Sequence, residues 1–293
     1  MDIKKIIQEQ KLFNFPIGLR DYDHGFESNE YHIFVFDGKS ELDKIIDSGG
    51  DGEYVIIHHA TLSEVRSKNL LLYDNLEIIK DDSWELRILL SKIKEKRSSL
   101  YDDFAKNCLI ESMFCCQKTR DAIRTSNVFA PCWQKCASYF LADAICSLNH
   151  KQSDPFSMLN MIRNLDPILI NEHIPVATQT VGIERATPTL LDRMLKSTIG
   201  FSNLVEKNNH SQIIQKKYDF YIKNSMLSDC HFYLGYINKE NFVKIASTLS
   251  MEQNLFHILK IAFDVEADSH LLQQHVDLVQ KSCNAILEMF SKE

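Results

Sequence analysis

The pattern of apolar residues changes near Asp82, and this change restricts the fold more than any other feature of the sequence. Before residue 82, short apolar runs of strand length alternate with short helical segments and polar turns. After residue 82, apolar residues recur at helical spacing to the end of the chain. Glycine and proline are scarce, nine and six in 293 residues, so we expect few turns and long helices.

This division predicts an α+β protein that is dominated by helix. We expect a small mixed-sheet α/β domain in residues 1–82 and a large all-α helical-bundle region in residues 83–293, which allows a further division near residue 170. The apolar runs of the first domain predict its elements one by one. They are a helix in 1–13, strands in 13–25, 31–38 and 53–62, a helix in 40–48 capped by Ser40, a helical turn in 62–67, and one or two strands in 70–81.

Prolines and apolar stripes organise the second region. Pro131 fits the first turn of a helix over 131–149, because its missing N–H has no helical partner there. Residues 164–182 contain two prolines and are predicted to be a connector. A helix over 269–290 carries an apolar stripe, which predicts a place in the bundle core or, alternatively, the seam of a homodimer.

Composition excludes several classes of protein. The formal net charge of −7 argues against duplex nucleic acid as a partner. No run approaches the roughly 18–20 apolar residues of a membrane span, and the first residues do not resemble a signal peptide. We therefore expect a cytoplasmic protein that does not bind a membrane, with its eight cysteines as free thiols.

The cysteines and histidines allow two interpretations. Zinc accepts both residue types, and the candidates are His58, His59, Cys115, Cys116, Cys132, Cys136 and His150. Adjacent strand histidines point to opposite faces, however, and free cysteine is among the most buried residue types. We therefore favour core cysteines and predict no metal site. The segment 171–189 is a separate candidate for a ligand cleft, with Glu172, His173, Glu184 and Arg185.

The strongest candidate for a functional site lies at the start of the strand in 31–38. Glu30 and His32 are two residues apart, so on a strand they share one face. A carboxylate and an imidazole placed side by side there are able to bind a metal ion. About ten residues earlier, Gly18 and Arg20 stand on the preceding strand.

Here the sequence resembles the nucleotidyltransferase superfamily that includes DNA polymerase beta and the kanamycin nucleotidyltransferases. That family has a Gly-Ser pair at a strand end, an Asp-x-Asp or Asp-x-Glu pair on the next strand, and a third carboxylate on a later strand. The resemblance covers roughly residues 12–165 and implies that Gly18 and Arg20 bind the nucleotide. It also implies that Glu30 and His32 stand where the family's catalytic acids bind two divalent metals.

The departures from the family pattern predict a degenerate active site. Leu19 stands where the family has serine, His32 replaces one acid, and Ile56 or Ile57 stands where the third carboxylate is expected. Magnesium prefers hard oxygen ligands, so it is expected as a cofactor only if the site is active. A transferase that uses a rearranged acidic set, Asp21, Asp23, Glu30 and Asp37, is a further alternative.

Two functions follow from the sequence. The first is a nucleotidyltransferase-like protein, inactive in metal-dependent transfer, that binds a nucleotide or another small ligand between its head and its helical body. The alternative is a helical scaffold or protein-interaction protein with a purely structural head. The long helical region favours this alternative, and a homodimer is compatible with both.

Overall fold

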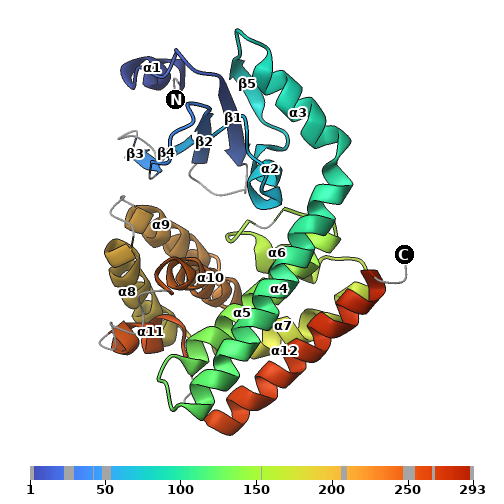
Figure 1. The fold of residues 1–293 in the computed structure, drawn as a ribbon. Helices are drawn as coiled ribbons and strands as arrows, with labels where there is room; N and C mark the ends of the chain where they lie inside the picture. The colour runs from blue at the N-terminus through green and yellow to red at the C-terminus, as the bar shows by residue number, and fades with distance from the viewer. Residues whose placement is uncertain are drawn as a thin grey trace. The chain divides into compact units, whose positions relative to one another are not determined.

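The computed structural model describes residues 3–22, 30–41, 43–47, 54–152, 154–205, 210–246, 255–265 and 268–290. It confirms the α+β class, with a small mixed sheet near the N-terminus and helices in the rest of the described chain (Figure 1). The chain forms two compact units, Met1–Tyr101 and Asp102–Glu293. Divisions at residues 82 and 170 stay predictions.

The first unit is built on a five-stranded sheet in the order β3-β4-β2-β1-β5. β2 and β4 are parallel, whereas the β1–β2, β1–β5 and β3–β4 pairs are antiparallel, so the sheet is mixed. The strands are β1 Ile17–Tyr22, β2 Glu30–Val35, β3 Lys44–Asp47, β4 Tyr54–His59 and β5 Glu77–Lys80.

One face of this sheet forms the core of the first unit. Ile33 and Val35 of β2 pack there with Val55 and Ile57 of β4, and Ile7 from helix α1 (Ile3–Glu9) covers them. Burial of each such side chain contributes about 1.5–3 kcal/mol. Because side chains alternate along a strand, the residues between them point to the opposite face, which carries the candidate site.

Two elements of the first unit differ from the prediction. The described residues of the predicted helix in 40–48 are not helical; instead Lys44–Asp47 is strand β3, paired antiparallel with β4. The β-branched pair in its centre suits a strand, and the exposed edge of β4 supplies hydrogen-bond partners that a local pattern does not reveal. Residues 70–73 belong to helix α2 (Ser67–Tyr73), so only Glu77–Lys80 of the predicted 70–81 run is a strand.

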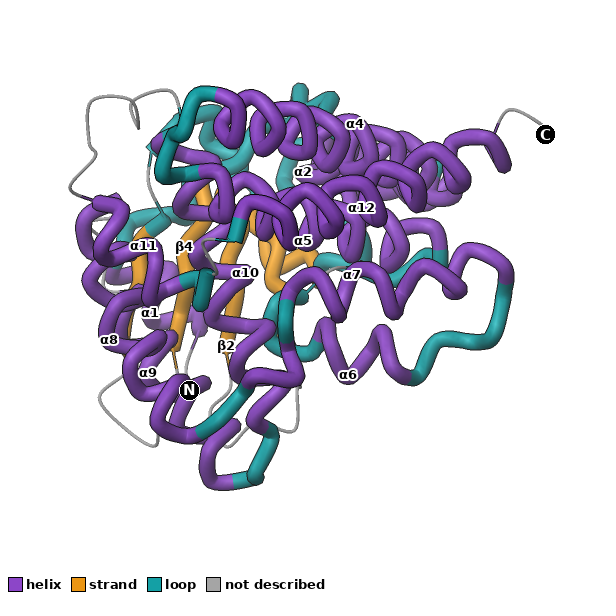
Figure 2. Tube along the Cα trace, turned by 90° about the horizontal axis from the view of Figure 1, so that it is seen from below, coloured by secondary structure: helices purple, strands orange, loops and turns teal. Residues whose placement is uncertain are grey.

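The described elements of the second unit are all helices. Helix α4 (Arg97–Arg124) begins in the first unit and continues into the second, where it lies beside α12 (Ser269–Phe290) (Figures 1 and 2). The other elements after β5 are α3 Glu85–Glu95, α5 Ala130–Leu148, α6 Met158–Arg163, η1 Leu169–His173, α7 Ile174–Val181, η2 Ile183–Arg185, α8 Pro188–Val205, α9 His210–Lys223, α10 Leu227–Ile245 and α11 Phe256–Ala262.

Helix α5 is the centre of this unit, because nearly all of its side chains are buried. As predicted, Pro131 lies in its first turn. The apolar stripe of α12 is also buried in the core of this same unit, including Val276 and Val279, so it is part of the bundle. The predicted connector is instead mostly helical, because residues 169–181 form η1 and α7, with Pro175 in the first turn of α7.

The cysteines behave as core residues. All eight are free thiols and all are buried. Burial raises the pKa of the Cys116 thiol to about 12, so the thiolate that would bind a metal or react is disfavoured.

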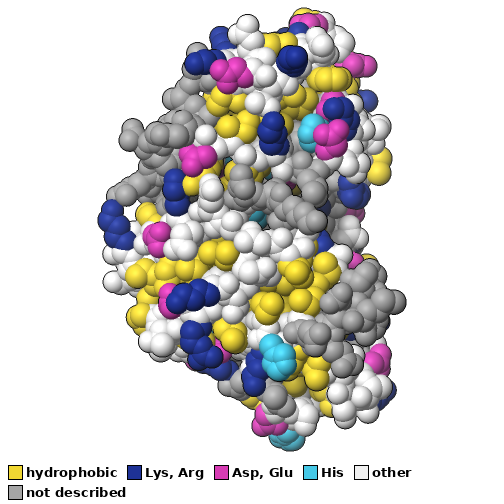
Figure 3. Space-filling model, turned by 90° about the vertical axis from the view of Figure 1, so that its left-hand side faces the viewer, with side chains coloured by type: hydrophobic (Ala, Val, Ile, Leu, Met, Phe, Trp, Pro, Cys, Tyr) yellow, Lys and Arg dark blue, Asp and Glu magenta, His cyan; other side chains and the backbone are white. Residues whose placement is uncertain are grey.

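The surface contains apolar and charged side chains in alternation. On the face drawn in Figure 3, hydrophobic side chains form several patches that Lys, Arg, Asp and Glu side chains interrupt. Scattered apolar surface is normal for a folded protein. Among the described residues, no helix combines the length and the apolar character that crossing a membrane requires.

Candidate functional site

Glu30 and His32 of β2 lie on the sheet face opposite α1. Their side chains approach each other, with 3.6 Å between Glu30 Oε2 and His32 Nε2. The Glu30 residue is buried, with only 4% of its surface exposed. A buried carboxylate next to an imidazole is favoured when the two share a proton.

His32 is also joined to His58 on the parallel strand β4. His32 Nδ1 and His58 Nε2 are 2.8 Å apart, so one ring nitrogen donates a hydrogen bond and the other accepts it. The rings are nearly parallel, with centroids 5.1 Å apart and an interplanar angle of 8°. The β2–β4 register produces this contact by pairing His32 with Ile56 and Phe34 with His58.

The far side of His58 contacts a second carboxylate. His58 Nδ1 lies 3.0 Å from Asp43 Oδ2, just before β3. Glu30, His32, His58 and Asp43 thus lie next to one another as a row of titratable groups, which we call the His32–His58 row. The exposed fraction of the side chain rises along the row, from 5% for Glu30 through 17% and 20% for the histidines to 46% for Asp43.

The predicted nucleotide-binding residues lie on the neighbouring strand β1. Arg20 stands opposite His32 in the β1–β2 register, and its Nη1 donates a 3.1 Å hydrogen bond to the carbonyl oxygen of Leu72 in α2. Gly18 has a packing reason, because a Cβ there would lie 2.7 Å from Leu76 Cδ1. The structure thus places Arg20 on the same face as the row, while Gly18 accommodates Leu76.

The residues present do not fit magnesium. Within the described residues, no group of three or more His, Cys, Asp and Glu side chains is arranged to hold a metal ion. Ile56, which faces His32 from β4, offers no oxygen ligand. Both ring nitrogens of His32 already face protein partners, Glu30 and His58. A hard cation that prefers six oxygen ligands would find two imidazoles here instead.

His59, the last residue of β4, makes a second contact between a histidine and a carboxylate. His59 Nδ1 lies 2.9 Å from Asp37 Oδ2, and the Asp37 side chain is 1% exposed. Asp37 therefore joins His59 rather than a rearranged acidic set with Glu30. Of that set, Asp23 and the Asp21 side chain lie outside what the structure describes.

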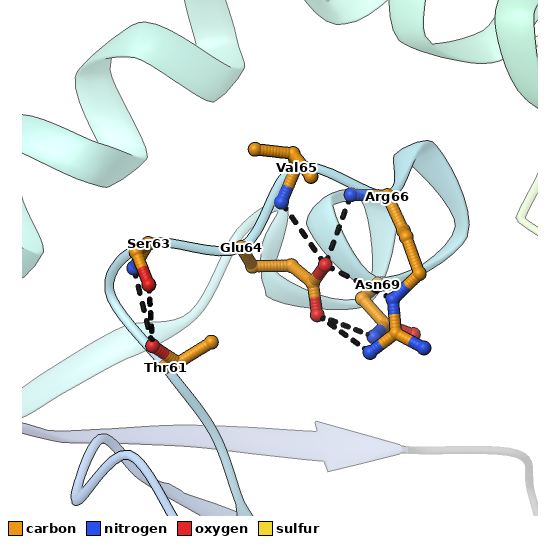
Figure 4. A network of polar contacts seen from close by, with 6 residues as sticks. All are labelled: Thr61, Ser63, Glu64, Val65, Arg66 and Asn69. Atoms are coloured by element: carbon orange, nitrogen blue, oxygen red, sulfur yellow. Dashed lines mark hydrogen bonds and ion pairs between the residues drawn. The ribbon is translucent and has the colours of Figure 1, made fainter.

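The loop after β4 is held by a carboxylate that accepts many hydrogen bonds. Glu64 accepts from the backbone N–H groups of Val65 and Arg66, from the Arg66 guanidinium and from Asn69 (Figure 4). The hydrogen bond from the Arg66 side chain contributes most to lowering the pKa of Glu64, which is about 2. This network orders the chain that leads into α2, on the site's face of the sheet.

Sequence reasoning identified Glu30 and His32 but missed Asp43 and the role of His58. The two-residue spacing of Glu30 and His32 is visible in the sequence. The contact of His32 with His58 depends on the parallel register of β2 and β4, which joins segments 26 residues apart. The only sign of this contact in the sequence was the position of His58, near the end of the apolar run that forms β4.

Comparisons with known proteins find few similarities. No family model and no curated protein matches this chain. Among solved structures, the chain is similar to the crystal structure of a nucleotidyltransferase-like protein from Exiguobacterium sibiricum 255-15, with 11% identity and a TM-score of 0.35. That alignment covers 99% of this chain and 89% of the other. At this identity and TM-score the likeness decides neither fold nor function.

Proposed function

We propose that this chain is a nucleotidyltransferase-like protein that binds a nucleotide or another small ligand on the sheet face with the His32–His58 row, without catalysing metal-dependent transfer. The 2.8 Å contact between His32 and His58 carries the proposal. His32 stands where the resemblance places a catalytic acid, and this contact gives it a hydrogen-bond partner inside the protein.

Two further observations support the loss of metal-dependent transfer. Ile56 faces His32 across the parallel pair, on the face where a third carboxylate would be needed. Glu30, His32 and Ile56 stand at the three positions where the resemblance places acids, and of these only Glu30 has a carboxylate. A single acid does not offset the charge of two divalent cations, which that mechanism requires.

Some polar groups of this face are able to bind an anionic ligand, beside the carboxylates of Glu30 and Asp43. Arg20 supplies a permanent positive charge, and the histidines are able to donate hydrogen bonds or to become protonated. A phosphate group is attracted by both kinds of side chain. Binding without chemistry needs only these contacts, so it survives the loss of a metal site.

A thermal-shift panel tests this proposal. The four ribonucleoside triphosphates are each added with and without magnesium or manganese. We expect a rise in Tm that does not need the metal, since a ligand at about 100 times its Kd adds about 2.7 kcal/mol. The rise should disappear in His32→Gln and persist in His257→Gln, a matched control with an exposed histidine in α11.

Two results would contradict the proposal. One is nucleotide transfer that requires magnesium and is abolished by Glu30→Ala. The other is the absence of a shift with any nucleotide.

An interaction function is the second candidate, and a specific feature of α4 favours it. Ile110 and Phe114 are one helical turn apart and are 60% and 50% exposed. Apolar pairs of this kind occur at interfaces between proteins. If they form a homodimer seam, Ile110→Ser should lower the mass measured by light scattering, whereas Lys196→Ser on α8, with a side chain that is 74% exposed, should leave it unchanged. If the wild-type chain is a monomer, the proposal of a homodimer seam at Ile110 and Phe114 is wrong.

A further inference from the structure

The His32–His58 row contains two imidazoles whose inner ring nitrogens face each other and whose outer nitrogens each face a carboxylate. His32 Nδ1 and His58 Nε2 are 2.8 Å apart. Beyond them, His58 Nδ1 lies 3.0 Å from Asp43 Oδ2, and His32 Nε2 lies 3.6 Å from Glu30 Oε2. All four side chains belong to the first unit, so the arrangement is formed within one compact part of the chain.

The protons of the two rings are too few for these three contacts. A neutral imidazole has one N–H, and Asp43 favours the His58 proton on Nδ1, which leaves His58 Nε2 with a bare lone pair. The His32 proton then lies either in the 2.8 Å gap or on the side of Glu30. In the second case two lone pairs face each other, and a cation between them stabilises both.

This pattern is typical of histidines that bind a transition metal. A histidine that binds a metal through one ring nitrogen commonly donates its other N–H to a carboxylate, which fixes the tautomer and the ring orientation. Asp43 and Glu30 lie where such partners of His58 and His32 are expected. Magnesium does not suit two imidazoles, whereas zinc, copper and nickel accept them.

The sheet holds the two rings in position for this role. His32 and His58 lie diagonally across the parallel strands, since the register pairs His32 with Ile56 and Phe34 with His58. Phe34 also stacks on the His58 ring, with centroids 4.6 Å apart. Two zinc–nitrogen bonds of about 2.0–2.1 Å in tetrahedral geometry need roughly 3.3 Å between the nitrogens, so the gap has to widen by about 0.5 Å. The histidine side chains are 17% and 20% exposed, so they are not closed to solvent.

Other candidates named from the sequence meet different partners. His59 contacts Asp37, and all eight cysteines are buried. In the segment 171–189, Arg185 pairs with the carboxylate that follows α11, and His173 Nδ1 lies 3.2 Å from a serine hydroxyl of α12. Each of these side chains thus meets a partner other than an imidazole.

We propose that His32 and His58 bind one divalent transition-metal ion through their facing nitrogens, with water or a bound ligand at the remaining positions. Within the described residues no group of three or more His, Cys, Asp and Glu side chains is arranged to hold a metal, so the protein supplies two ligands. The ion is therefore held more weakly than in a structural zinc site, which has four protein ligands. Binding needs no nucleotide, so this proposal and the nucleotide proposal are able to fail separately.

Isothermal titration calorimetry of the full chain with zinc chloride, without any nucleotide, tests this site. Magnesium chloride is the matched control for a divalent charge. We expect zinc to bind one ion per chain and magnesium to give no saturable binding, because imidazole nitrogens suit zinc and not a hard cation.

Variants of the row decide where the ion binds. Asp43→Asn should weaken zinc binding by about tenfold, because an amide holds the His58 N–H less well than a carboxylate does. His58→Gln removes a ligand and should weaken zinc binding further. His257→Gln is the matched control, since it removes an exposed histidine in α11.

The proposal fails if zinc does not bind the wild-type chain, or if magnesium binds as tightly as zinc. It also fails if His58→Gln binds zinc with the affinity of the wild type, because the ion then lies elsewhere on the chain. If His58→Gln does not fold, Asp43→Asn decides instead, since the Asp43 side chain is 46% exposed and its loss leaves no buried group unpaired. Unchanged affinity in Asp43→Asn then overturns the proposal.

Discussion

The two units contain titratable groups in opposite settings. In the first unit, the His32–His58 row runs from the buried carboxylate of Glu30 to the exposed one of Asp43. In the second, the Lys239 ammonium and the Asp143 carboxylate are 2.9 Å apart, and their side chains are 1% and 3% exposed. Groups with a path to solvent are able to exchange protons and bind ligands, whereas a closed pair serves the fold.

The surroundings of Lys239 show how a closed pair is stabilised. Tyr236 donates a 2.8 Å hydrogen bond to Asp143 Oδ1, and the Lys239 ammonium lies over the rings of Phe140 and Tyr236. Burial works to lower the pKa of Lys239, but the carboxylates of Asp143 and Glu240 hold that pKa well above its usual value. The Lys239 ammonium is therefore favoured at neutral pH.

The largest expected effect comes from breaking this pair. Lys239→Met leaves the Asp143 carboxylate buried without its cation and should lower the free energy of unfolding by about 3–5 kcal/mol. Urea denaturation at pH 7 measures it. The double variant Lys239→Met/Asp143→Asn should recover much of the loss, because no charge is then buried. A loss below about 1 kcal/mol in the single variant would show that the pair is not closed to water.

Packing in the same region gives the next test. A Cβ at Gly235 in α10 would lie 1.9 Å from Tyr139 Oη, whereas one at Gly200 in α8 meets nothing within 4 Å. Gly235→Ala should therefore destabilise the protein by about 1–3 kcal/mol or more. Gly200→Ala should stabilise it by up to about 1 kcal/mol, because alanine is the better helix former. Chemical denaturation of both variants checks the contrast, and equal effects would contradict it.

The two histidines that end β4 divide the first unit in the same way. His59 contacts the buried Asp37 (1% exposed), and His58 contacts the half-exposed Asp43 (46% exposed). His59→Asn should cost about 1–3 kcal/mol, because it removes one hydrogen-bond partner from the buried Asp37 carboxylate and leaves it the Lys39 N–H and ammonium. His58→Asn should cost about 1 kcal/mol, because water replaces its partner at Asp43 and the variant loses the one hydrogen bond to His32. The reverse order, measured by urea denaturation, would contradict this account of the row.

The smallest effect is the pH dependence that Glu64 contributes. Its pKa is about 2 in the folded protein against 4.5 for the free group, so its stabilisation is complete above about pH 4.5. It is lost as pH falls from 4.5 towards 2, because the unfolded chain then binds the proton more tightly. Glu64→Gln should cost about 1–2 kcal/mol at pH 7.

The measurement is the difference in unfolding free energy between the wild type and Glu64→Gln as a function of pH. This difference should shrink steadily below pH 4.5. A difference that does not change between pH 7 and pH 3 would show that the charge of Glu64 does not matter for the network in Figure 4.

Much of the architecture could be predicted from local pattern. The runs that became β2 and β4 consist of consecutive apolar residues of strand length, and the stripe of α12 repeats at helical spacing. β3 could not be predicted in this way, because residues 40–48 have a weak pattern and the strand forms by pairing with β4. The helical turns in 169–181 were hidden by Pro175, which is compatible with a helix only in its first turn.

The sequence by itself determined that Glu30 and His32 share a face, because side chains alternate along a strand whatever its neighbours are. It also determined that Pro131 starts a helix and that the cysteines of this chain suit a core. These features depend on residues close together in the chain.

Only the tertiary structure decided what those residues touch. His58 reaches His32 because β2 and β4 are parallel in one register, and Lys135 reaches the carbonyl oxygen of Val181 because α5 packs against α7. Such contacts join segments far apart in the chain. They depend on the free energy of packing the whole fold, which no local pattern contains.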